Sequence, residues 1–414
     1  MVISIWPGMT SPPTAIRCTT IVTCEVDGWP ARRGEPRLVK DGVVAWVGEA
    51  LTYVGPHDGF RGDIDEDHSG RTVIPGFVDC HTHLPFIGWR DDEYAARLRG
   101  VSYRHLHGEG GIRRSARMLD EASDDEVLDF CRPLLAEMIA HGTTTLELKT
   151  GYGLSVDREL RQARLARRLA ADSPQTATVT LLACHAVPDG TTREEWVKIA
   201  CKELIPRAAE ENLIDAVDVY VEDIAFSVED LRRVAEAADR AGLPVRCHAD
   251  QLGASSAAEA AVSLGARSVD HLNHLSAEGV EALAKSDTVG VLLPASTLML
   301  RATPAPSQKL VEAGAAIAVA TDFNPGTSPV LSMPETIALA CAVYGLTPLS
   351  ALVASTANPA WVLGRHQQVG TLEPGKRADL VVLEGDGFEM VPYRPGHNPV
   401  VSVFVGGTRV SGRE

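Results

Sequence analysis

One pattern restricts the fold of this chain more than any other: short apolar runs alternate with helical stretches through its middle. Eight runs are typical of buried strands: Val73–Val78, Thr143–Leu148, Thr178–Leu182, Ala216–Val221, Val245–Cys247, Ser268–Val269, Val289–Leu293 and Ile317–Ala320. Helices are predicted between most of them: Asp124–His141, Arg158–Ala171, Arg193–Glu211, Ser227–Ala241, Ala254–Leu264, Ala277–Lys285 and Pro306–Ala313. Asp124, Ser227 and Ser276 are predicted as N-caps of three of these helices.

Repeated strand–helix units of this kind predict an α/β fold, a (β/α)8 TIM-type barrel. An open doubly wound sheet is the alternative. No G-x-G-x-x-G motif follows an early strand, so the barrel is the better prediction.

The two ends of the chain have a different character, with short strands separated by Gly, Pro and Asp. Strands are predicted at Ile16–Glu25, Arg37–Lys40, Val43–Val47 and Leu51–Val54, then within Gly370–Leu383, at Val400–Val405 and at Arg409–Val410. Neither end can bury a core alone, so we expect the two to combine in one small β-sandwich domain. The expected division assigns residues 1–72 and 366–414 to this domain and residues 73–365 to the barrel.

Composition argues against some classes of partner. The chain of 414 residues has a formal net charge of −16 and no basic cluster, which argues against nucleic acid or an anionic membrane as a partner. An anionic substrate would therefore need a locally placed arginine. The eight cysteines are scattered without a C-x-x-C pair, which fits a reducing compartment. With no basic N-terminal region and no apolar run of membrane-spanning length, we expect a cytoplasmic protein.

Histidines follow the predicted barrel strands at the ends where TIM-type barrels hold their functional groups. His81 and His83 end the first strand and, being two residues apart, point to the same face. Further candidates follow later strands: His185, His248, His271 and Asp322. Any single one of these histidines would be an ordinary core residue. Five at equivalent positions indicate a shared centre.

Several histidines and a carboxylate, with room left for water, suit a catalytic divalent ion, Zn²⁺ or Fe²⁺. Such an ion lowers the pKa of its water and polarises a carbonyl oxygen. We predict Asp322 as ligand and general base, because a carboxylate beside the ion can accept the proton of the water. His271 is predicted to orient the hydroxide or to steady the developing oxyanion.

Longer motifs in the barrel segment carry a family resemblance. They are Cys80–Leu84 (CHTHL), Gly88–Arg90 (GWR), Gly142–Thr145 (GTTT), Glu147–Leu154 (ELKTGYGL), His185–Pro188 (HAVP), His248–Gln251 (HADQ), Asp270–Leu272 (DHL) and Thr321–Ser328 (TDFNPGTS). With these motifs the chain resembles the amidohydrolase superfamily and, within it, the imidazolonepropionase family. The resemblance implies hydrolysis of a cyclic amide C–N bond, 4-imidazolone-5-propanoate to N-formimidoyl-L-glutamate in histidine degradation, by a homodimer.

Carried over by position, the resemblance implies one set of metal ligands and one set of substrate contacts. The metal ligands are His81, His83, His248 and Asp322. The substrate contacts are Arg90, Tyr103, Tyr152, His185, Gln251, Asn324, Gly326 and Thr327. Relatives with two metal ions often bridge them through a carbamylated lysine at the end of strand four. This chain has Glu222-Asp223 there, so we expect one ion.

Residue chemistry supports several contacts and leaves alternatives open. Arg90 offers a planar fork for a propionate carboxylate, but it could instead be a surface arginine paired with Asp91 or Asp92. Tyr103 and Tyr152 could stack on a flat ring or donate to its oxygen, and for Tyr103 ordinary helix packing is equally compatible.

Two further residues have structural alternatives. The Pro and Gly after Asn324 fix a turn that either presents this amide beside the metal or is purely structural. Lys149 is expected to form an ion pair with Glu147 or Glu222.

Three positions depart from the family pattern: Trp89, where a small or acidic residue is usual, Glu109 in a glycine-rich segment, and Asn273 in place of a glutamate. A related heterocycle is therefore an alternative substrate.

Deamination of an aminated heterocycle is a second alternative, disfavoured because Asp250 and Gln251 stand where such deaminases have a strand-five glutamate. A non-catalytic barrel acting as an assembly subunit is a third, but such proteins tend to lose the ligands that this chain keeps.

Overall fold

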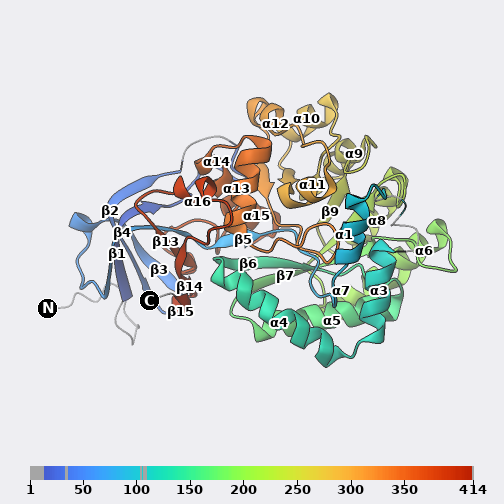
Figure 1. Ribbon diagram of the computed structural model, residues 1–414, viewed down its shortest axis with the longest axis horizontal. Helices are drawn as coiled ribbons and strands as arrows, with labels where there is room; N and C mark the ends of the chain where they lie inside the picture. Colours follow the sequence, from blue (N-terminus) through green and yellow to red (C-terminus); the bar gives the residue numbers. More distant parts are fainter. Residues whose placement is uncertain (1–13, 33–35, 103–104, 106–109, 413–414) are drawn as a thin grey trace.

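A nearly closed barrel of eight parallel strands forms the larger part of the molecule (Figure 1). The computed structural model describes residues 14–32, 36–102, 105 and 110–412. Its barrel strands are β5 (Phe77–Asp79), β6 (Thr143–Lys149), β7 (Thr176–Cys184), β8 (Ala216–Val221), β9 (Val245–Ala249), β10 (Ser268–His271), β11 (Val289–Leu292) and β12 (Ile317–Val319). The segments after β5 and β12 meet where the His83 N–H donates to the Phe323 carbonyl at 2.8 Å. The predicted barrel is confirmed.

Helices surround the barrel largely where the sequence predicts them. They are α4 (Asp124–Ala140), α5 (Val156–Asp172), α6 (Arg193–Ile199), α7 (Ile205–Glu210), α8 (Val228–Arg240), α9 (Ala257–Ser263), α10 (Ala277–Ala284) and α12 (Ser307–Ala313). Others lie in connections where no helix was predicted: α1 (Asp91–Leu98), α3 (Gly111–Glu121), α11 (Pro294–Leu300), α13 (Met333–Tyr344), α14 (Pro348–Ala354), α15 (Ala357–Val362) and α16 (Met390–Tyr393). No helix in the described ranges is both long and apolar enough to cross a membrane.

Two of the three predicted N-caps are confirmed. The hydroxyls of Ser227 and Ser276 accept hydrogen bonds from the first turns of α8 and α10. At α4 the cap is Ser123, one residue before the predicted Asp124. Its hydroxyl and the carboxylate of Glu126 form a reciprocal capping box. Asp124 is instead in the first turn, where its negative charge is favourable beside the helix N-terminus.

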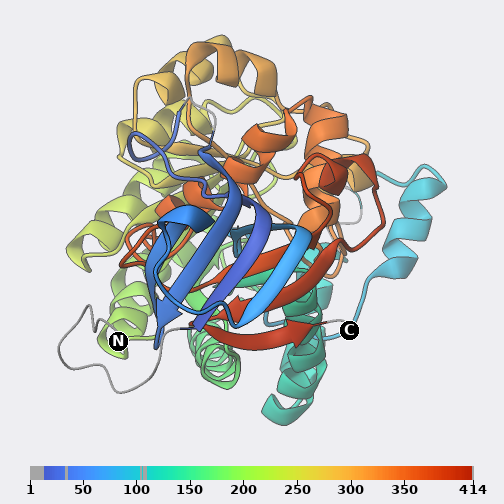
Figure 2. The same cartoon turned by 90° about the vertical axis from the view of Figure 1, so that its left-hand side faces the viewer.

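A second sheet joins the two ends of the chain (Figure 2). In the order β15-β14-β13-β4-β1-β2-β3, its strands are β15 (Thr408–Gly412), β14 (Val400–Val405), β13 (Leu380–Glu384), β4 (Glu66–Pro75), β1 (Thr14–Val22), β2 (Leu38–Val47) and β3 (Ala50–Pro56). The termini are linked where β4 pairs antiparallel with β13, Val73 opposite Val382. A separate apolar core forms on this sheet. The expected joining of the two chain ends in one small β unit is therefore confirmed, and the structure describes this unit as a single seven-stranded sheet.

The predicted first strand, Val73–Val78, is divided between the two sheets. β4 ends at Pro75, which lacks an N–H group for the ladder, and β5 begins at Phe77. A Cβ on Gly76 would lie 2.1 Å from the hydroxyl of Thr144, so only glycine lets the backbone pass this close to β6. The strand that leads to His81 and His83 thus continues directly from the terminal sheet.

Candidate active site

The predicted strand-end groups converge at the C-terminal end of the barrel. His81 Nε2 lies 3.3 Å from His83 Nε2 and 3.5 Å from Asp322 Oδ1, and His83 Nε2 lies 3.2 Å from the same oxygen. His81, His248 and His271 form a second group, in which one ring nitrogen of each residue lies within 4.8 Å of the other two. These five side chains are buried. We call them the histidine–aspartate cluster.

Burial sets the protonation states of the histidine–aspartate cluster. It lowers the pKa of His81 far below the usual value and that of His271 to about 3, so both rings are neutral. Burial works against ionisation of Asp322, yet its hydrogen bond with His83 and the attraction of the surrounding histidines together outweigh this effect and hold the pKa of the carboxyl below its usual value. Neutral imidazoles and an ionised carboxylate are the forms that bind a divalent cation.

The cluster fits a divalent metal ion. Nitrogen and carboxylate oxygen donors are the set that Zn²⁺ and Fe²⁺ accept in catalytic sites. His248 Nε2 is buried and has no hydrogen-bond partner among the described residues. A buried ring nitrogen without a partner is costly, and a cation among these rings would satisfy it.

A cavity adjoins the cluster. The predicted substrate residues that line it are Arg90, Tyr152, His185, Gln251, Asn324 and Thr327. Gly326 is not part of its wall, and Tyr103 lies outside the described residues. Two lining residues, Ile112 and Tyr220, were not predicted. Tyr220 is on β8, two positions before Glu222, which follows the strand, so strand alternation could have identified it. Ile112 has no comparable signal.

Arg90 lies inside this cavity and not on the surface. Its side chain is 3% exposed, and Asp92, one of the two alternative partners, binds Arg114 at 2.7 Å. Nη1 of Arg90 lies 3.8 Å from Glu93, while Nε and Nη1 have no hydrogen-bond partner among the described residues. A Cβ on Gly326 would lie 1.9 Å from Nη2, so this glycine makes room for the guanidinium group.

The turn in the K-T-G-Y-G-L motif is held by helix α5. Glu159 accepts hydrogen bonds from the N–H groups of Gly151, Gly153 and Leu154 at 3.0, 2.7 and 2.9 Å. Gly151 has φ of +115°, a conformation that requires glycine. The turn therefore fixes Tyr152 at the wall of the cavity.

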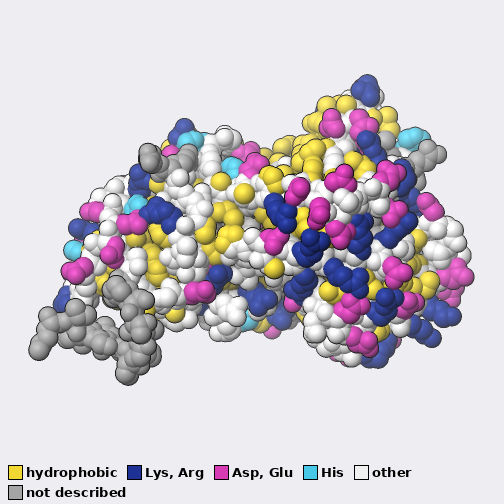
Figure 3. Space-filling model, turned by 90° about the horizontal axis from the view of Figure 1, so that it is seen from below, with side chains coloured by type: hydrophobic (Ala, Val, Ile, Leu, Met, Phe, Trp, Pro, Cys, Tyr) yellow, Lys and Arg dark blue, Asp and Glu magenta, His cyan; other side chains and the backbone are white. Residues whose placement is uncertain are grey.

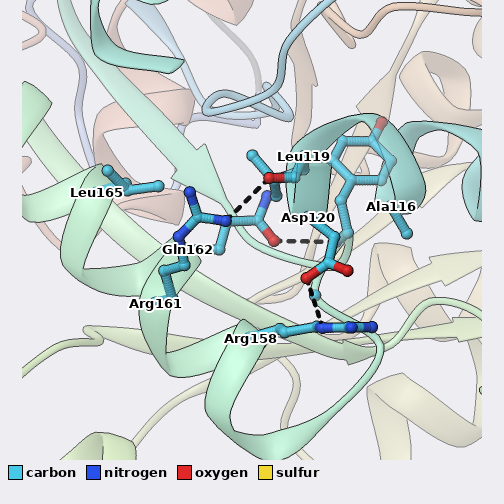
Figure 4. Close-up of a pocket in the computed structure, with 9 residues that line it drawn as sticks. Ala116, Leu119, Asp120, Arg158, Arg161, Gln162 and Leu165 are labelled. Carbon is cyan, nitrogen blue, oxygen red and sulfur yellow. Dashed lines mark hydrogen bonds and ion pairs between the residues drawn. The ribbon is translucent and has the colours of Figure 1, made fainter. Parts of the chain in front are cut away.

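Behind Tyr152 lies a smaller hollow between α3 and α5. Figure 4 shows that its charged groups are already paired: Arg158 binds Asp120 at 2.7 Å, and Arg161 donates to the Leu119 carbonyl at 2.9 Å. These contacts pack α3 against α5 and so support the wall that Tyr152 forms.

His185 presents a defined nitrogen to the cavity. Its Nδ1 lies 3.1 Å from the carbonyl oxygen of Gly151. A carbonyl can only accept, so Nδ1 has the hydrogen atom and Nε2 is the acceptor nitrogen. The ring stacks on His83 with centroids 5.3 Å apart.

Asn324 holds its turn together and contacts Asp322. Its Nδ2 donates to the backbone carbonyl and to Oδ1 of Asp322 at 2.6 and 3.2 Å. Its Oδ1 accepts the N–H groups of Gly326 and Thr327 at 2.9 and 2.7 Å. The turn therefore orients Asp322, whose backbone is held in the left-handed region at φ of 54°.

Lys149 forms the expected ion pair with Glu147, the first of its two alternative partners. Its Nζ lies 2.9 Å from Glu147 and 2.6 Å from Asp218. Glu222 is not its partner, because that carboxylate accepts the N–H groups of Gln251 and Leu252 at 2.6 and 2.8 Å. Burial raises the pKa of Glu222 to about 7.

Comparison with known proteins places this arrangement in a family. A sequence model of the amidohydrolase family matches residues 72–410. An imidazolonepropionase of Rhizorhabdus wittichii is 41% identical over 370 residues, covering 88% of this chain and 93% of the relative. Another, of Rubrobacter xylanophilus, is 40% identical over 387 residues, covering 90% and 92%. The chain belongs to the imidazolonepropionase family of amidohydrolases.

Solved structures of more distant proteins have the same fold. An adenosine deaminase from Xanthomonas campestris with bound zinc superimposes with a TM-score of 0.71 at 20% identity, covering 96% of this chain and 93% of that one. Escherichia coli guanine deaminase gives 0.70 at 18% identity, covering 98% and 100%. At such low identity the likeness concerns the fold alone.

Two of the departures from the imidazolonepropionase pattern lie outside the cavity wall. The Trp89 ring packs against Phe86, Phe130 and Phe323 with centroids 5.4, 5.8 and 6.0 Å apart. Asn273 donates to the Thr297 hydroxyl at 3.0 Å and to a backbone carbonyl at 2.7 Å. Glu109, the third departure, lies outside the described residues. Trp89 adjoins Arg90 in sequence, but its indole belongs to this aromatic cluster.

Proposed function

We propose that this protein hydrolyses 4-imidazolone-5-propanoate to N-formimidoyl-L-glutamate, the ring-opening step of histidine degradation. The single observation that carries the proposal is Arg90, a buried guanidinium on the same cavity as the histidine–aspartate cluster, whose Nε and Nη1 have no hydrogen-bond partner among the described residues. The substrate has one group for each part of the cavity. Its carboxylate would bind Arg90, and its cyclic amide carbonyl would lie at the histidine–aspartate cluster. Similarity to imidazolonepropionases over most of the chain supports the assignment.

One divalent ion, Zn²⁺ or Fe²⁺, belongs to the proposal, with His81, His83, His248 and Asp322 as ligands. When bound, it supplies Lewis acidity, which lowers the pKa of water and polarises a carbonyl oxygen. The absence of a lysine after β8, where Glu222 and Asp223 stand, supports a single ion.

Asp322 is the proposed general base. As water adds to the ring carbonyl carbon, the ionised carboxylate accepts one proton of that water. The C–N bond then breaks, and the proton passes from Asp322 to the departing ring nitrogen. His271, neutral because burial lowers its pKa to about 3, can donate its ring N–H to the developing oxyanion without releasing a proton.

The remaining cavity residues bind and orient the substrate. Arg90 would bind the propionate through two parallel N–H···O bonds. His185, with its hydrogen on Nδ1, would accept a ring N–H at Nε2. Tyr152, Gln251 and Thr327 complete the wall against which the flat ring lies.

Deamination has less support. Asp250, the acidic residue near His248, is directed into its own loop, where Oδ1 accepts the N–H and the hydroxyl of Ser255 at 2.7 and 2.8 Å. Gln251 does line the cavity, but an amide cannot accept and return a proton as a glutamate does.

The test combines metal analysis of the purified protein with an assay on freshly generated imidazolone propionate. We expect about one divalent ion per subunit and release of N-formimidoylglutamate, followed by NMR. A metal-loaded protein that leaves this substrate intact would contradict the proposal. Turnover of a ring without the propionate would favour the related heterocycle, and ammonia release from an aminated ring would favour deamination.

We also propose that the protein is a cytoplasmic homodimer. All eight cysteines are free thiols, which fits a reducing compartment. The dimer rests on the family resemblance, and light scattering coupled to size-exclusion chromatography would test it.

A further inference from the structure

Beneath the histidine–aspartate cluster, the barrel interior contains charged side chains. Glu147 and Lys149 on β6, Asp218 on β8, Arg246 on β9 and Asp270 on β10 are each at most 1% exposed. Barrel interiors are usually filled by branched apolar side chains. Buried charges are costly and often replaceable by apolar residues without loss of stability, so this charged layer calls for a reason other than stability.

Surface arginines provide a contrast. Figure 3 shows basic and acidic side chains interleaved on the face formed by α4 and α5. There Arg132 and Asp172 pair at 2.8 Å with both side chains 45% exposed. Water solvates such pairs, so they contribute little to the free energy of folding and hold the side chains only weakly in one geometry. Arg246 has no comparable access to water, so its charge must be balanced within the protein.

Arg246 uses all three of its guanidinium nitrogens. Nη1 binds Glu147, and Nη2 donates to Asp270 Oδ2 at 3.1 Å and to the Cys80 carbonyl at 2.7 Å. Nε donates to the Ser268 hydroxyl at 3.0 Å. The guanidinium therefore connects β9 to β6, to β10 and to the backbone immediately before His81.

Lys149 completes the charged layer on its other side. Its Nζ lies 2.6 Å from Asp218 Oδ2 and 2.9 Å from Glu147 Oε2. Glu147 thus lies between the two cations and links them. Three carboxylates and two cations leave the charged layer with one net negative charge, which favours a divalent cation above it.

The two outer carboxylates of the charged layer contact histidines of the cluster. Asp270 Oδ2 lies 2.6 Å from Nδ1 of His81, and Asp218 Oδ2 lies 3.1 Å from Nδ1 of His248. Both carboxylate oxygens already accept hydrogen bonds from cations, Asp270 Oδ2 from Arg246 and Asp218 Oδ2 from Lys149. Asp270 Oδ2 is therefore the acceptor toward His81, whose Nδ1 has the hydrogen atom and whose Nε2 keeps its lone pair. Nδ1 of His248 faces Asp218 in an electrostatic contact whose geometry is not that of a hydrogen bond. Carboxylates in this position fix the tautomer and orientation of metal-binding histidines.

We propose that Arg246 and Lys149 are positioning residues of the metal centre. They hold Asp270 and Asp218 in place, and these carboxylates in turn keep Nε2 of His81 and of His248 directed toward the cluster. The inference rests on the metal centre of the proposed function and is independent of which heterocycle the enzyme opens.

The first test replaces each outer carboxylate by its amide, in Asp270→Asn and Asp218→Asn. We expect metal affinity, measured by competition with a chromophoric chelator, to fall about 10- to 100-fold in each variant. In the metal-free protein, ¹⁵N NMR of the imidazoles should report the Nδ1–H tautomer for His81 and His248. Each variant should lose this signature at the histidine that faces the altered residue.

The second test concerns the cations. Arg246→Lys keeps a positive charge but cannot reach Glu147, Asp270 and the Cys80 carbonyl together, so we expect about 10-fold weaker metal binding. Arg377→Met is the matched control. Arg377 donates to Thr176 at the N-terminal start of β7 at 2.6 Å, at the opposite end of the barrel from the cluster. This control should lower thermal stability and leave metal affinity unchanged.

Folded amide variants that keep wild-type metal affinity and the Nδ1–H signature would overturn the inference. If Arg246→Lys fails to fold, the metal affinity and the imidazole tautomers of Asp270→Asn and Asp218→Asn test the inference without it. Weakened metal binding in the variants, together with a wild type that binds metal but leaves imidazolone propionate intact, would support this inference and contradict the proposed substrate.

Discussion

The barrel interior and the terminal sheet differ in what they bury. Under the histidine–aspartate cluster the barrel buries five charged side chains at exposures of 0–1%. The core of the terminal sheet is apolar, with Val73, Leu380, Val382 and Phe404 among its members. Each buried apolar side chain of this kind stabilises the fold by roughly 1.5–3 kcal/mol. A buried ion pair often contributes nothing relative to an apolar replacement.

This difference separates stability from function along the chain. The sheet built from both termini can account for folding energy, because its contacts need no particular charge or protonation state. The proposed role of the charged layer and the histidine–aspartate cluster is to bind and orient a metal ion, and neither is needed for apolar burial. Substitutions in the two regions should therefore have different consequences for stability, metal binding and turnover.

The largest expected effect is in the cluster. His248→Ala removes a proposed ligand at 3% exposure, so metal and activity should be lost together. Metal content by mass spectrometry and turnover would be measured on the same preparation. Retention of one ion per subunit in the folded variant would remove His248 from the ligand set.

Asp322→Asn should have the next largest effect. The amide keeps the size of the side chain but cannot accept a proton, so kcat should fall about 10²- to 10⁴-fold. The assay must be made on metal-loaded protein, which separates proton transfer from coordination. A near-normal kcat in that state would show that another group is the base.

The matching substitution in the terminal sheet is Leu380→Ala. Leu380 is fully buried in β13 and faces the apolar core, so the free energy of unfolding should fall by about 2–5 kcal/mol. Denaturant unfolding would measure this loss, while kcat and metal content of the folded protein should stay at wild-type values. A parallel loss of kcat at a temperature where the variant is folded would contradict the separation of the two regions.

The sequence predicted the barrel because its strands are buried on both faces and stand out as apolar runs. It missed helices such as α13–α15, which follow the last strand, where the alternation ends. It also joined β4 to β5, because Pro75-Gly76 is too short an interruption to mark a change of sheet. The boundaries at residues 72 and 365 stay a prediction.

The strand-end histidines could be predicted because barrel topology brings equivalent positions together. The charged layer could not be assembled in the same way. Arg246 and Asp270 stand out as charges within apolar strands, but Arg246 and Glu147 are 99 positions apart, and no local pattern pairs them. The catalytic and substrate roles of individual residues also stay predictions until the variants are measured.

Arg90 gives the smallest of the expected effects and tests the substrate itself. A bidentate charge-assisted pair in a largely buried cavity contributes about 1.5–3 kcal/mol, so Arg90→Met should lower kcat/KM for imidazolone propionate roughly 10- to 150-fold. Arg132→Met, which removes an exposed arginine of α4 paired with Asp172, is the control and should change kcat/KM little. Wild type should discriminate against an analogue whose carboxylate is an amide, and Arg90→Met should not. If wild type opens the amide as readily as the acid, Arg90 does not bind a carboxylate, and a related heterocycle becomes the better assignment.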